Sequence, residues 1–266
     1  MKHEVTPGLI ENLGTAEAPA SKKGVGKKGT VQGNDALSEA NYLGYTIASV
    51  DIETLDLSQN CVVYEIGIIF TNVLPRAGRL WGTKDIATLL HMGETQTGLV
   101  FEREVLKISI IEQMLNGRTV DQGTLDFHSR EMRKRGLEAA DFFTAHEKNA
   151  SRVAVARKLL CAAFAKHKPK EVWVNHTSFD IPRITGALFN NEVNALPWNF
   201  RAECDIATAK VAYRWRLNSL DSKLKPDPLR FPDAELDEKH DSIADCLYNL
   251  SALSVCLFDV IERKDQ

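Results

Sequence analysis

The sequence predicts a single α/β domain with a mixed five-stranded sheet flanked by helices. Strand-like segments come first along the chain, and a short, almost entirely apolar strand then alternates with amphipathic helices. Strands that come first, followed by alternation of strand and helix, imply one α/β domain with a mixed sheet. With 266 residues, the chain is also long enough to bury one large core.

The first part of this domain is predicted to be rich in strands. Residues 45–53 and 61–73 are dominated by β-branched and other apolar side chains. The short polar loop 56–60 between them suits a hairpin turn, so the two strands are expected to pair. Residues 79–90 are interpreted as a third strand of the same group.

Helices predominate in the second part. Apolar spacing predicts helices over 119–135 and 151–168, and the first of these opens on an Asp or Thr cap. The apolar run 171–176 is typical of a buried strand. The remaining predicted elements are a helix over 178–191, a strand over 199–205, a short helix over 205–215 and a long closing helix over 240–263.

Composition excludes several classes of protein. The formal net charge of -3 supplies no general positive field, so contact with nucleic acid would depend on local basic groups. Five widely spread cysteines without a C-x-x-C spacing argue against a disulfide framework and against a thiolate zinc site. The N-terminal residues contain no apolar core of signal-peptide length, and no run elsewhere reaches membrane-spanning length without a charge. A soluble cytoplasmic protein without a membrane partner is expected.

The first 42 residues differ from the rest of the chain. They are rich in Lys, Gly, Ala and Ser and poor in large apolar groups. Such a segment cannot bury enough surface to offset the entropy lost on ordering. We therefore expect residues 1–42 to be a flexible tail and residues 43–266 to form the folded domain.

Two carboxylates lie at the end of the first predicted strand. Asp51 and Glu53 are two residues apart, so alternation of side chains along a strand places them on the same face. Like charges held that close repel each other unless a positive charge lies between them. A divalent metal site is one interpretation, and a pair of solvated acids at the end of a strand is the other.

Further candidates lie after the strand 171–176 and at the start of the closing helix. Asp180 follows the strand 171–176, where an acid near a helix N-terminus is also common without any chemical role. Asp245 falls in the first turn of the closing helix if Asp241 or Ser242 is its N-cap, and His240 then lies just before the helix. Active sites of open α/β sheets gather at such strand ends.

Together these groups form a set suited to hydrolysis of phosphodiester bonds. Carboxylates are the preferred side-chain ligands of Mg²⁺ and Mn²⁺. Two such ions about 3.5–4 Å apart can stabilise the attacking and leaving oxygens of an in-line displacement. A histidine with a pKa near 6.5 can accept a proton from an attacking water at neutral pH.

The motifs DIET at 51–54, NHTSFD at 175–180 and KHDSIAD at 239–245 resemble those of the DEDDh family of 3′–5′ exonucleases. The resemblance covers roughly residues 45–262. The segment LNGRTVDQGTLDFH is similar to the group of the phage exonuclease DexA and the mycobacterial-type exoribonucleases. Phe127 and His128 stand where that group usually carries tryptophan, which is a departure from the subfamily pattern and not from the catalytic motifs.

The resemblance implies an RNase H-like fold, with strands one to three antiparallel and the later strands parallel to the first. It also implies a role for each motif residue. Asp51, Glu53, Asp180 and Asp245 would bind two Mg²⁺ or Mn²⁺ ions, and His240 would be the general base. Thr54 and Leu55 would hold the terminal nucleotide, although Leu55 also suits an ordinary apolar turn. The implied activity is metal-dependent 3′–5′ exonuclease cleavage that releases nucleoside 5′-monophosphates.

The substrate sugar is left open. Phage relatives indicate DNA, which is slightly favoured, and mycobacterial-type relatives indicate an exoribonuclease acting on RNA. The expected location is the cytoplasm of a bacterium or of a phage-infected host. A non-catalytic module that binds nucleic acid or a protein is the alternative outside enzymes, but it would be expected to lose one of the five motif residues, and all five are present.

Local basic groups offer candidate contacts with nucleic acid. A cluster of four basic residues at 130–135 suits either a phosphate contact or a solvated helix face. Trp215 lies among basic residues at 214–225 and is interpreted either as a base-stacking group or as a side chain buried under the closing helix. Arg118 and Thr119 are named as candidate substrate contacts.

Overall fold

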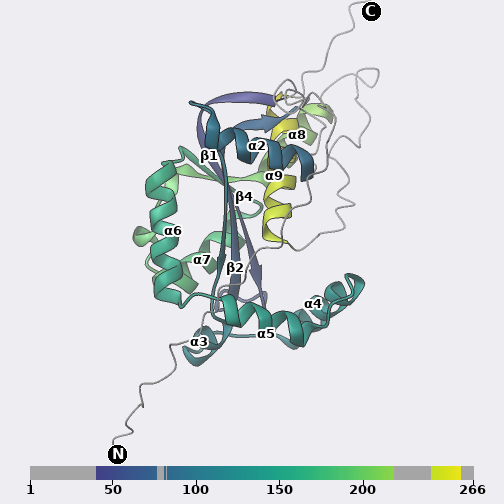
Figure 1. The fold of residues 1–266 in the computed structure, drawn as a ribbon, viewed down its shortest axis with the longest axis vertical. Helices are drawn as coiled ribbons and strands as arrows, with labels where there is room; N and C mark the ends of the chain where they lie inside the picture. The colour runs from purple at the N-terminus through teal and green to yellow at the C-terminus, as the bar shows by residue number, and fades with distance from the viewer. Residues whose placement is uncertain (1–39, 77–80, 82, 219–240, 259–266) are drawn as a thin grey trace, which may run out of the picture. The chain divides into compact units, whose positions relative to one another are not determined.

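The computed structural model describes residues 40–76, 81, 83–218 and 241–258, and these form a five-stranded mixed sheet with helices on both faces (Figure 1). The strands occur in the order β3-β2-β1-β4-β5. Their bounds are β1 Ala40–Thr54, β2 Val63–Pro75, β3 Phe101–Lys107, β4 Glu171–Val174 and β5 Glu203–Asp205. β1, β2 and β3 pair antiparallel, and β4 and β5 run parallel to β1. The predicted mixed sheet and its RNase H-like strand directions are confirmed.

Helices connect the strands and continue to the end of the described chain. Those found within the described residues are α2 Thr83–Thr95, α3 Ile110–Leu115, α4 Gln122–Lys134, α5 Ala139–Asn149, α6 Val153–His167, α7 Thr177–Phe189, α8 Ile206–Asn218 and α9 Ser242–Phe258. Short 3-10 helices cover Val193–Ala195 and Phe200–Ala202. The helices expected over 119–135, 151–168, 178–191 and 205–215 are confirmed, as is the described part of the closing helix.

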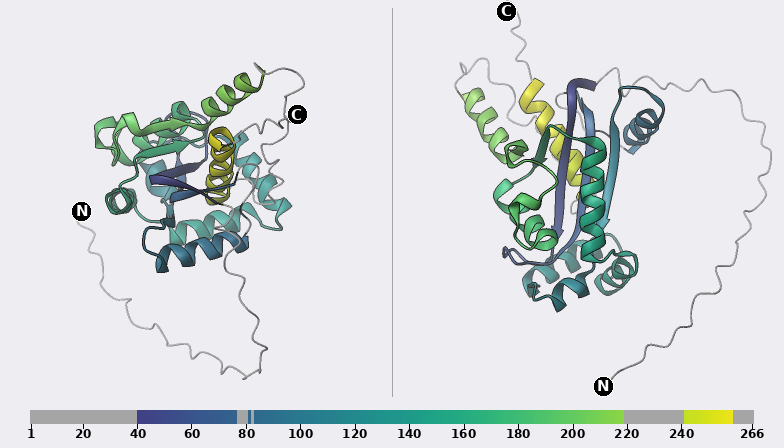
Figure 2. Two further views of the ribbon diagram at one scale, coloured as in Figure 1. Left: turned by 90° about the horizontal axis from the view of Figure 1, so that it is seen from above. Right: turned by 90° about the vertical axis from the view of Figure 1, so that its left-hand side faces the viewer.

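The sheet separates two apolar clusters (Figure 2). Alternate residues of β1, such as Val50 and Ile52, pack with α6 and α7 on one face. Ile47 packs with α2 and α9 on the other face. Ser49, on the same face as Ile47, donates a hydrogen bond from Oγ to the Cys246 carbonyl of α9 at 3.2 Å. Because Asp51 and Glu53 continue this alternation, they face α9.

The prediction of a strand over residues 79–90 is wrong. Residues 83–95 form α2, whose Ile86, Leu89 and Leu90 recur at helical spacing and pack against the α9 face of the sheet. The third strand is β3 instead, in which exposed residues such as Arg103 and Lys107 alternate with more buried positions. An edge strand of this kind has too little apolar character to stand out in the sequence.

A third apolar cluster joins the loop after β1 to helices that the sequence did not predict, α3 and α5. Its buried members are Leu55, Val62, Tyr64 and Ile110, packed against side chains of α4 and α5. Asp121 begins α4 as predicted, since its Oδ2 accepts a hydrogen bond from the Thr124 amide at 2.8 Å. These helices lie across the carboxyl end of β1 (Figure 1).

Two sequence predictions concern the chain outside this sheet. Residues 1–39 of the expected N-terminal tail lie outside the described residues, and residues 40–42 form the beginning of β1. Within the described ranges, no helix is long and apolar enough to cross a membrane.

Candidate active site

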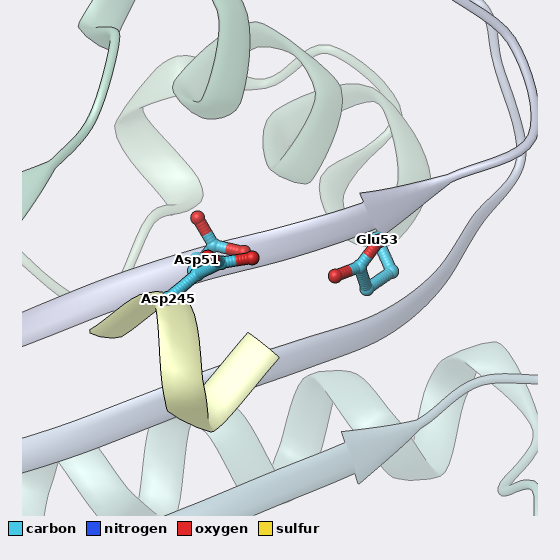
Figure 3. A group of neighbouring side chains, drawn as sticks. All are labelled: Asp51, Glu53 and Asp245. Carbon is cyan, nitrogen blue, oxygen red and sulfur yellow. The ribbon is translucent and has the colours of Figure 1, made fainter. Parts of the chain in front are cut away.

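Three carboxylates from two elements meet on the α9 face of the sheet. Asp51 and Glu53 on β1 and Asp245 in the first turn of α9 each offer an oxygen, and these oxygens all lie within 4.8 Å of one another (Figure 3). Residues almost 200 positions apart in the chain are therefore brought together by the packing of α9 on β1. The strand alternation that predicted a shared face for Asp51 and Glu53 is borne out in this geometry.

A glycine allows α9 to begin so close to the strands. Gly67 on β2 lies opposite Asp51 in the antiparallel register. A Cβ atom added at Gly67 would lie 2.5 Å from the Ser242 Oγ and 2.7 Å from the Ser242 carbonyl carbon, closer than such atoms can approach. The Cys246 Sγ lies 3.4 Å from the Gly67 carbonyl oxygen, one turn further along α9. Gly67 was missed in the sequence, although a glycine within a buried strand often marks such a close approach.

The first turn of α9 is also fixed by hydrogen bonds. The Asp241 Oδ1 accepts hydrogen bonds from the amides of Ile243 at 3.0 Å and Ala244 at 3.1 Å, so Asp241 caps the helix as the sequence suggested. The Ser242 hydroxyl donates to Glu65 Oε1 on β2 at 2.7 Å. These contacts determine where Asp245, three residues beyond Ser242, enters the carboxylate group.

Glu65 is a further acid that the sequence did not single out. It pairs in register with Glu53 on one side and with Lys107 of β3 on the other. It lies within a strand whose remaining pattern is apolar, and its position beside Glu53 depends on the strand register, which the sequence alone does not give. Glu65 therefore joins the site through pairing and not through a motif.

Asp180 lies beside the other three carboxylates and is held differently. It occupies the first turn of α7 and is 5% exposed. Its Oδ2 accepts a hydrogen bond from the backbone amide of His176 at 3.1 Å, which fixes the carboxylate at the helix N-terminus. It is not part of the group within 4.8 Å, but its charge contributes to the raised pKa of Asp51.

The acids of the site resist ionisation in the absence of a cation. Burial, followed by the charges of Asp245 and Glu53, raises the pKa of Asp51 well above its usual range. Burial and the charge of Asp245 raise the pKa of Glu53 to about 8. Burial raises the pKa of Asp180 to about 6. Clustered oxygen donors that repel one another are the environment that a hard divalent cation stabilises, so these residues fit a metal site.

The remaining motif residues are placed less directly. His240 lies outside the described residues. The Thr54 carbonyl accepts a hydrogen bond from His128 Nε2 at 2.9 Å. The Leu55 side chain is 2% exposed in the third apolar cluster, and its backbone amide and carbonyl bond to Val62 at 3.0 Å and Asp121 at 2.8 Å. The structure therefore does not bring the Leu55 side chain to the surface of the site.

A small pocket of about 140 Å³ opens beside Glu53. His128, which stands near the position where relatives carry tryptophan, lies edge-on to Tyr64 with ring centroids 5.7 Å apart. Burial lowers the pKa of His128, which favours the neutral imidazole near pH 7. The lining combines the aromatic side chains of Tyr64, His128 and Phe142 with charged side chains that include Glu65, Lys107 and Arg135.

The candidate basic contacts have separate outcomes. Trp215 on α8 is 71% exposed, so the interpretation that it is buried under α9 is wrong. The lysines at 223 and 225 lie outside the described residues. Arg135 of the basic cluster at 130–135 lines the pocket beside Glu53, whereas Lys134 forms a surface ion pair with Glu131 at 2.7 Å.

Comparison with known proteins gives one family and one fold. Residues 46–257 match the family model described as the 3′–5′ exoribonuclease Rv2179c-like domain. The structure described as Exonuclease I (apo) is similar with a TM-score of 0.50 and 11% identity, covering 79% of this chain and 41% of that chain. The metal-free form of the E. coli ExoI–ssDNA complex gives a TM-score of 0.50 and 12% identity, covering 79% of this chain and 39% of that chain.

These solved structures are similar in fold alone, because their sequences differ so widely from this one. The chain spans about two fifths of their length, with 41% and 39% covered. No curated protein is significantly similar in sequence.

Proposed function

Because the chain belongs to the Rv2179c-like family of 3′–5′ exoribonuclease domains, we propose that it is a metal-dependent 3′–5′ exonuclease that releases nucleoside 5′-monophosphates. The observation that carries the proposal is the group of Asp51, Glu53 and Asp245, whose oxygens lie within 4.8 Å of one another. The family match, together with closely spaced acids that repel one another, supports cation-dependent phosphodiester hydrolysis over a purely structural role for these acids.

Four carboxylates are proposed to hold the metal. Asp51, Glu53 and Asp245 supply the compact group, and Asp180 supplies a fourth acid from the start of α7. When bound, two Mg²⁺ or Mn²⁺ ions would stabilise the charge that develops on the attacking and leaving oxygens of the phosphodiester. The chain itself contributes fixed positions for these acids, through Gly67, the Asp241 cap and the hydrogen bond from His176 to Asp180.

His240 is proposed as the general base. Its imidazole would accept a proton from the attacking water, a role suited to a group whose ordinary pKa is near 6.5. Its support is the H-x4-D spacing to Asp245 and its position directly before the Asp241 cap. In the proposed reaction, water attacks phosphorus, the ester bond to the preceding nucleotide breaks, and the 3′-terminal nucleotide leaves with its 5′-phosphate.

Contact between the terminal nucleotide and Thr54 and Leu55 stays a prediction. The burial of the Leu55 side chain weakens it for that residue. The pocket beside Glu53 is proposed to contact part of the terminal nucleotide, since its lining combines aromatic and charged side chains with Glu53 of the carboxylate group. Sequence-tolerant stacking on aromatic side chains is common where single strands bind.

RNA is proposed as the main substrate. The family description names an exoribonuclease, and it covers most of the chain. The likeness to exonuclease I, including a structure with single-stranded DNA, concerns the fold alone at 11–12% identity. The sequence slightly favoured DNA, so DNA is tested as the second substrate.

The experiment compares 5′-labelled single-stranded RNA and DNA of one sequence with Mg²⁺, with Mn²⁺ and with EDTA. We expect a ladder that shortens from the 3′ end only with metal, with RNA cleaved faster. The product at the end of the reaction is identified as nucleoside 5′-monophosphate by chromatography. Binding of both strands without cleavage under any metal condition would instead support the non-catalytic module.

A further inference from the structure

A second polar pocket lies at the carboxyl end of α7, on the helix whose first turn carries Asp180. Its volume is about 440 Å³, within the usual range for small-ligand sites. Five of its nine lining residues are carboxamides, one is an arginine and none is acidic. The polar residues are Asn60, Gln113, Asn116, Arg118, Asn190 and Asn191.

Arg118 is anchored at one end of its guanidinium and open at the other. Its Nη1 donates a hydrogen bond to the Cys61 carbonyl, and burial lowers the pKa of the guanidinium. Among the described residues, no hydrogen-bond partner is found for its Nη2. A half-buried guanidinium with one free edge is suited to an anionic oxygen, because the fork geometry matches phosphate.

The free edge of Arg118 lies over a glycine of α7. A Cβ atom at Gly186 would lie 2.5 Å from Arg118 Nη2 and 3.1 Å from the Asn191 Oδ1. The missing side chain therefore leaves room in which the guanidinium and a carboxamide approach the same point. Ala187 and Val153 add a small apolar surface to the lining.

The asparagines at the end of α7 present amide groups to solvent. Asn190 and Asn191 have φ angles of 51° and 64°, the left-handed region that asparagine tolerates better than most residues. Both residues are exposed, and within the described part of the chain their side chains form no hydrogen bond. By contrast, the Gln113 side-chain amide accepts a hydrogen bond from the Val63 amide and donates to the carbonyls of Val63 and Ser109, so it is held in place in the pocket lining.

From this arrangement we propose that the pocket binds a nucleotide, with its phosphate at Arg118 and its base edge at Asn190 and Asn191. The carboxyl end of α7 carries a partial negative charge, so the anionic part of the ligand belongs on the Arg118 side. Carboxamides can both donate to and accept from a base, which suits recognition of its polar edge.

The nucleotide has two possible sources. It is either a unit of the bound strand upstream of the 3′ end, which rests on the proposed function, or a free mononucleotide, which does not. Gly186 and Asn190 lie about 9 and 15 Å beyond Asp180 along the helix axis. At about 3.4 Å per stacked nucleotide, a strand would need roughly three to five nucleotides to reach the pocket.

The test uses Asn191→Asp and Gly186→Ala in the full chain. Asn191→Asp keeps the size of the side chain and adds a negative charge beside Arg118 Nη2, whereas Gly186→Ala fills the point where the two groups meet. Asn194→Asp is the matched control, because Asn194 is exposed, lies close by in sequence and does not line the pocket. Binding of 5′-AMP, a dinucleotide and a decanucleotide of RNA is measured by calorimetry in EDTA, which prevents hydrolysis.

Both pocket variants are expected to weaken nucleotide binding about tenfold. Asn191→Asp adds one unfavourable charge at a partly exposed site, and Gly186→Ala displaces the Arg118 guanidinium from its place over α7. If the variants lose affinity for 5′-AMP as well as for the decanucleotide, the ligand of the pocket is a free mononucleotide. If they lose affinity for the decanucleotide alone, the ligand is a unit of the bound strand. Equal affinities of both variants, Asn194→Asp and wild type for all three probes would overturn the proposal. Because binding is measured without cleavage, a protein that shows this loss but no nuclease activity would retain the pocket and lose the proposed function.

Discussion

The two ends of α7 carry opposite chemistry. At its first turn, Asp180 lies beside Asp51, Glu53 and Asp245, which are acids that repel one another. At its last turn, Asn190 and Asn191 lie beside Arg118, in a pocket without an acidic lining residue. The first end is suited to a cation and the second to an anion, although a single helix of 13 residues joins them.

The two ends of α7 also differ in how their charge responds to pH and to metal. The acids have pKa values raised to about 8 for Glu53 and about 6 for Asp180, so their charge depends on pH and on metal. Carboxamides do not titrate, and the guanidinium of Arg118 stays charged at neutral pH. Changes at the carboxylate end should therefore alter metal dependence and pH profiles, while changes at the carboxamide end should alter affinity only.

The largest expected effect comes from removing one acid of the compact group. Asp51→Asn or Asp245→Asn should lower exonuclease activity below detection, because metal ions supply several kcal/mol of transition-state stabilisation. Each variant should unfold in EDTA at a temperature equal to or above that of wild type, since a repulsive buried charge is removed.

Asp126→Asn is the control, because Asp126 is exposed on α4 outside the cluster. Activity is followed as release of nucleoside monophosphate in Mg²⁺, and stability is followed by circular dichroism. An active Asp51→Asn enzyme would remove the carboxylate group from the proposed mechanism.

The next largest effect is expected at His240, where loss of catalysis can be distinguished from loss of metal binding. His240→Ala should lower kcat about 10²–10⁴-fold, the usual contribution of a general base. The affinity for Mn²⁺, measured by calorimetry, should be nearly unchanged, because the acids remain. A variant that loses Mn²⁺ affinity in proportion to activity would instead make His240 part of the metal site.

A smaller effect is expected at the glycine that brings α9 onto the sheet. Gly67→Ala should force the start of α9 away from β2, because its Cβ would lie 2.7 Å from the Ser242 backbone carbon. Overpacking of this kind costs about 1–3 kcal/mol of unfolding free energy. Displaced supporting contacts at metal sites commonly cost about 10–100-fold in activity or metal affinity.

Gly44→Ala serves as the matched control, since Gly44 also lies on a strand and a Cβ there would meet nothing within 4 Å. Urea unfolding and exonuclease assays are compared for the two variants. Equal behaviour of Gly67→Ala and Gly44→Ala would mean that the position of α9 does not depend on this contact.

The carboxylate end could be predicted from the sequence much further than the carboxamide end. Asp51 and Glu53 lie on one strand, so alternation alone places them together, and the Asp241 cap determines the turn that contains Asp245. Glu65 and Gly67 could not be singled out in this way. Their roles depend on the register of β2 with β1 and on the docking of α9, which are tertiary features.

The carboxamide pocket has no counterpart in the sequence pattern. Its polar residues come from the loop after β1, from α3 and the turn beyond it, and from the end of α7, and asparagine at such positions ordinarily indicates only a turn. The error over residues 79–90 has a related cause. Apolar residues in a short segment fit a strand or a helix, and packing on the α9 face of the sheet favours the helix α2.

The smallest expected effect, and the one most specific to the carboxylate end, is the dependence of stability on pH in EDTA. Burial and repulsion raise the pKa of Glu53 from 4.5 to about 8, so the folded state binds more protons than the unfolded state between these values. Its contribution to stability is therefore lost as pH rises through about 8. Burial lowers the pKa values of His128 and His146 below 6.5. These histidines make stability rise with pH, which is the opposite of the effect of Glu53, and their effect ends near pH 6.5.

The window from about pH 6.5 to 8 therefore isolates the acids, and the unfolding free energy in EDTA should fall across it. Saturating Mg²⁺ should flatten the slope, because a bound cation stabilises the ionised acids. Glu53→Gln should also flatten it without metal, whereas Asn191→Asp at the carboxamide end should leave it unchanged. Urea unfolding at a series of pH values measures all four conditions. A wild-type stability that rises through this window in EDTA would contradict the raised pKa of Glu53 and, with it, the contrast between the two ends of α7.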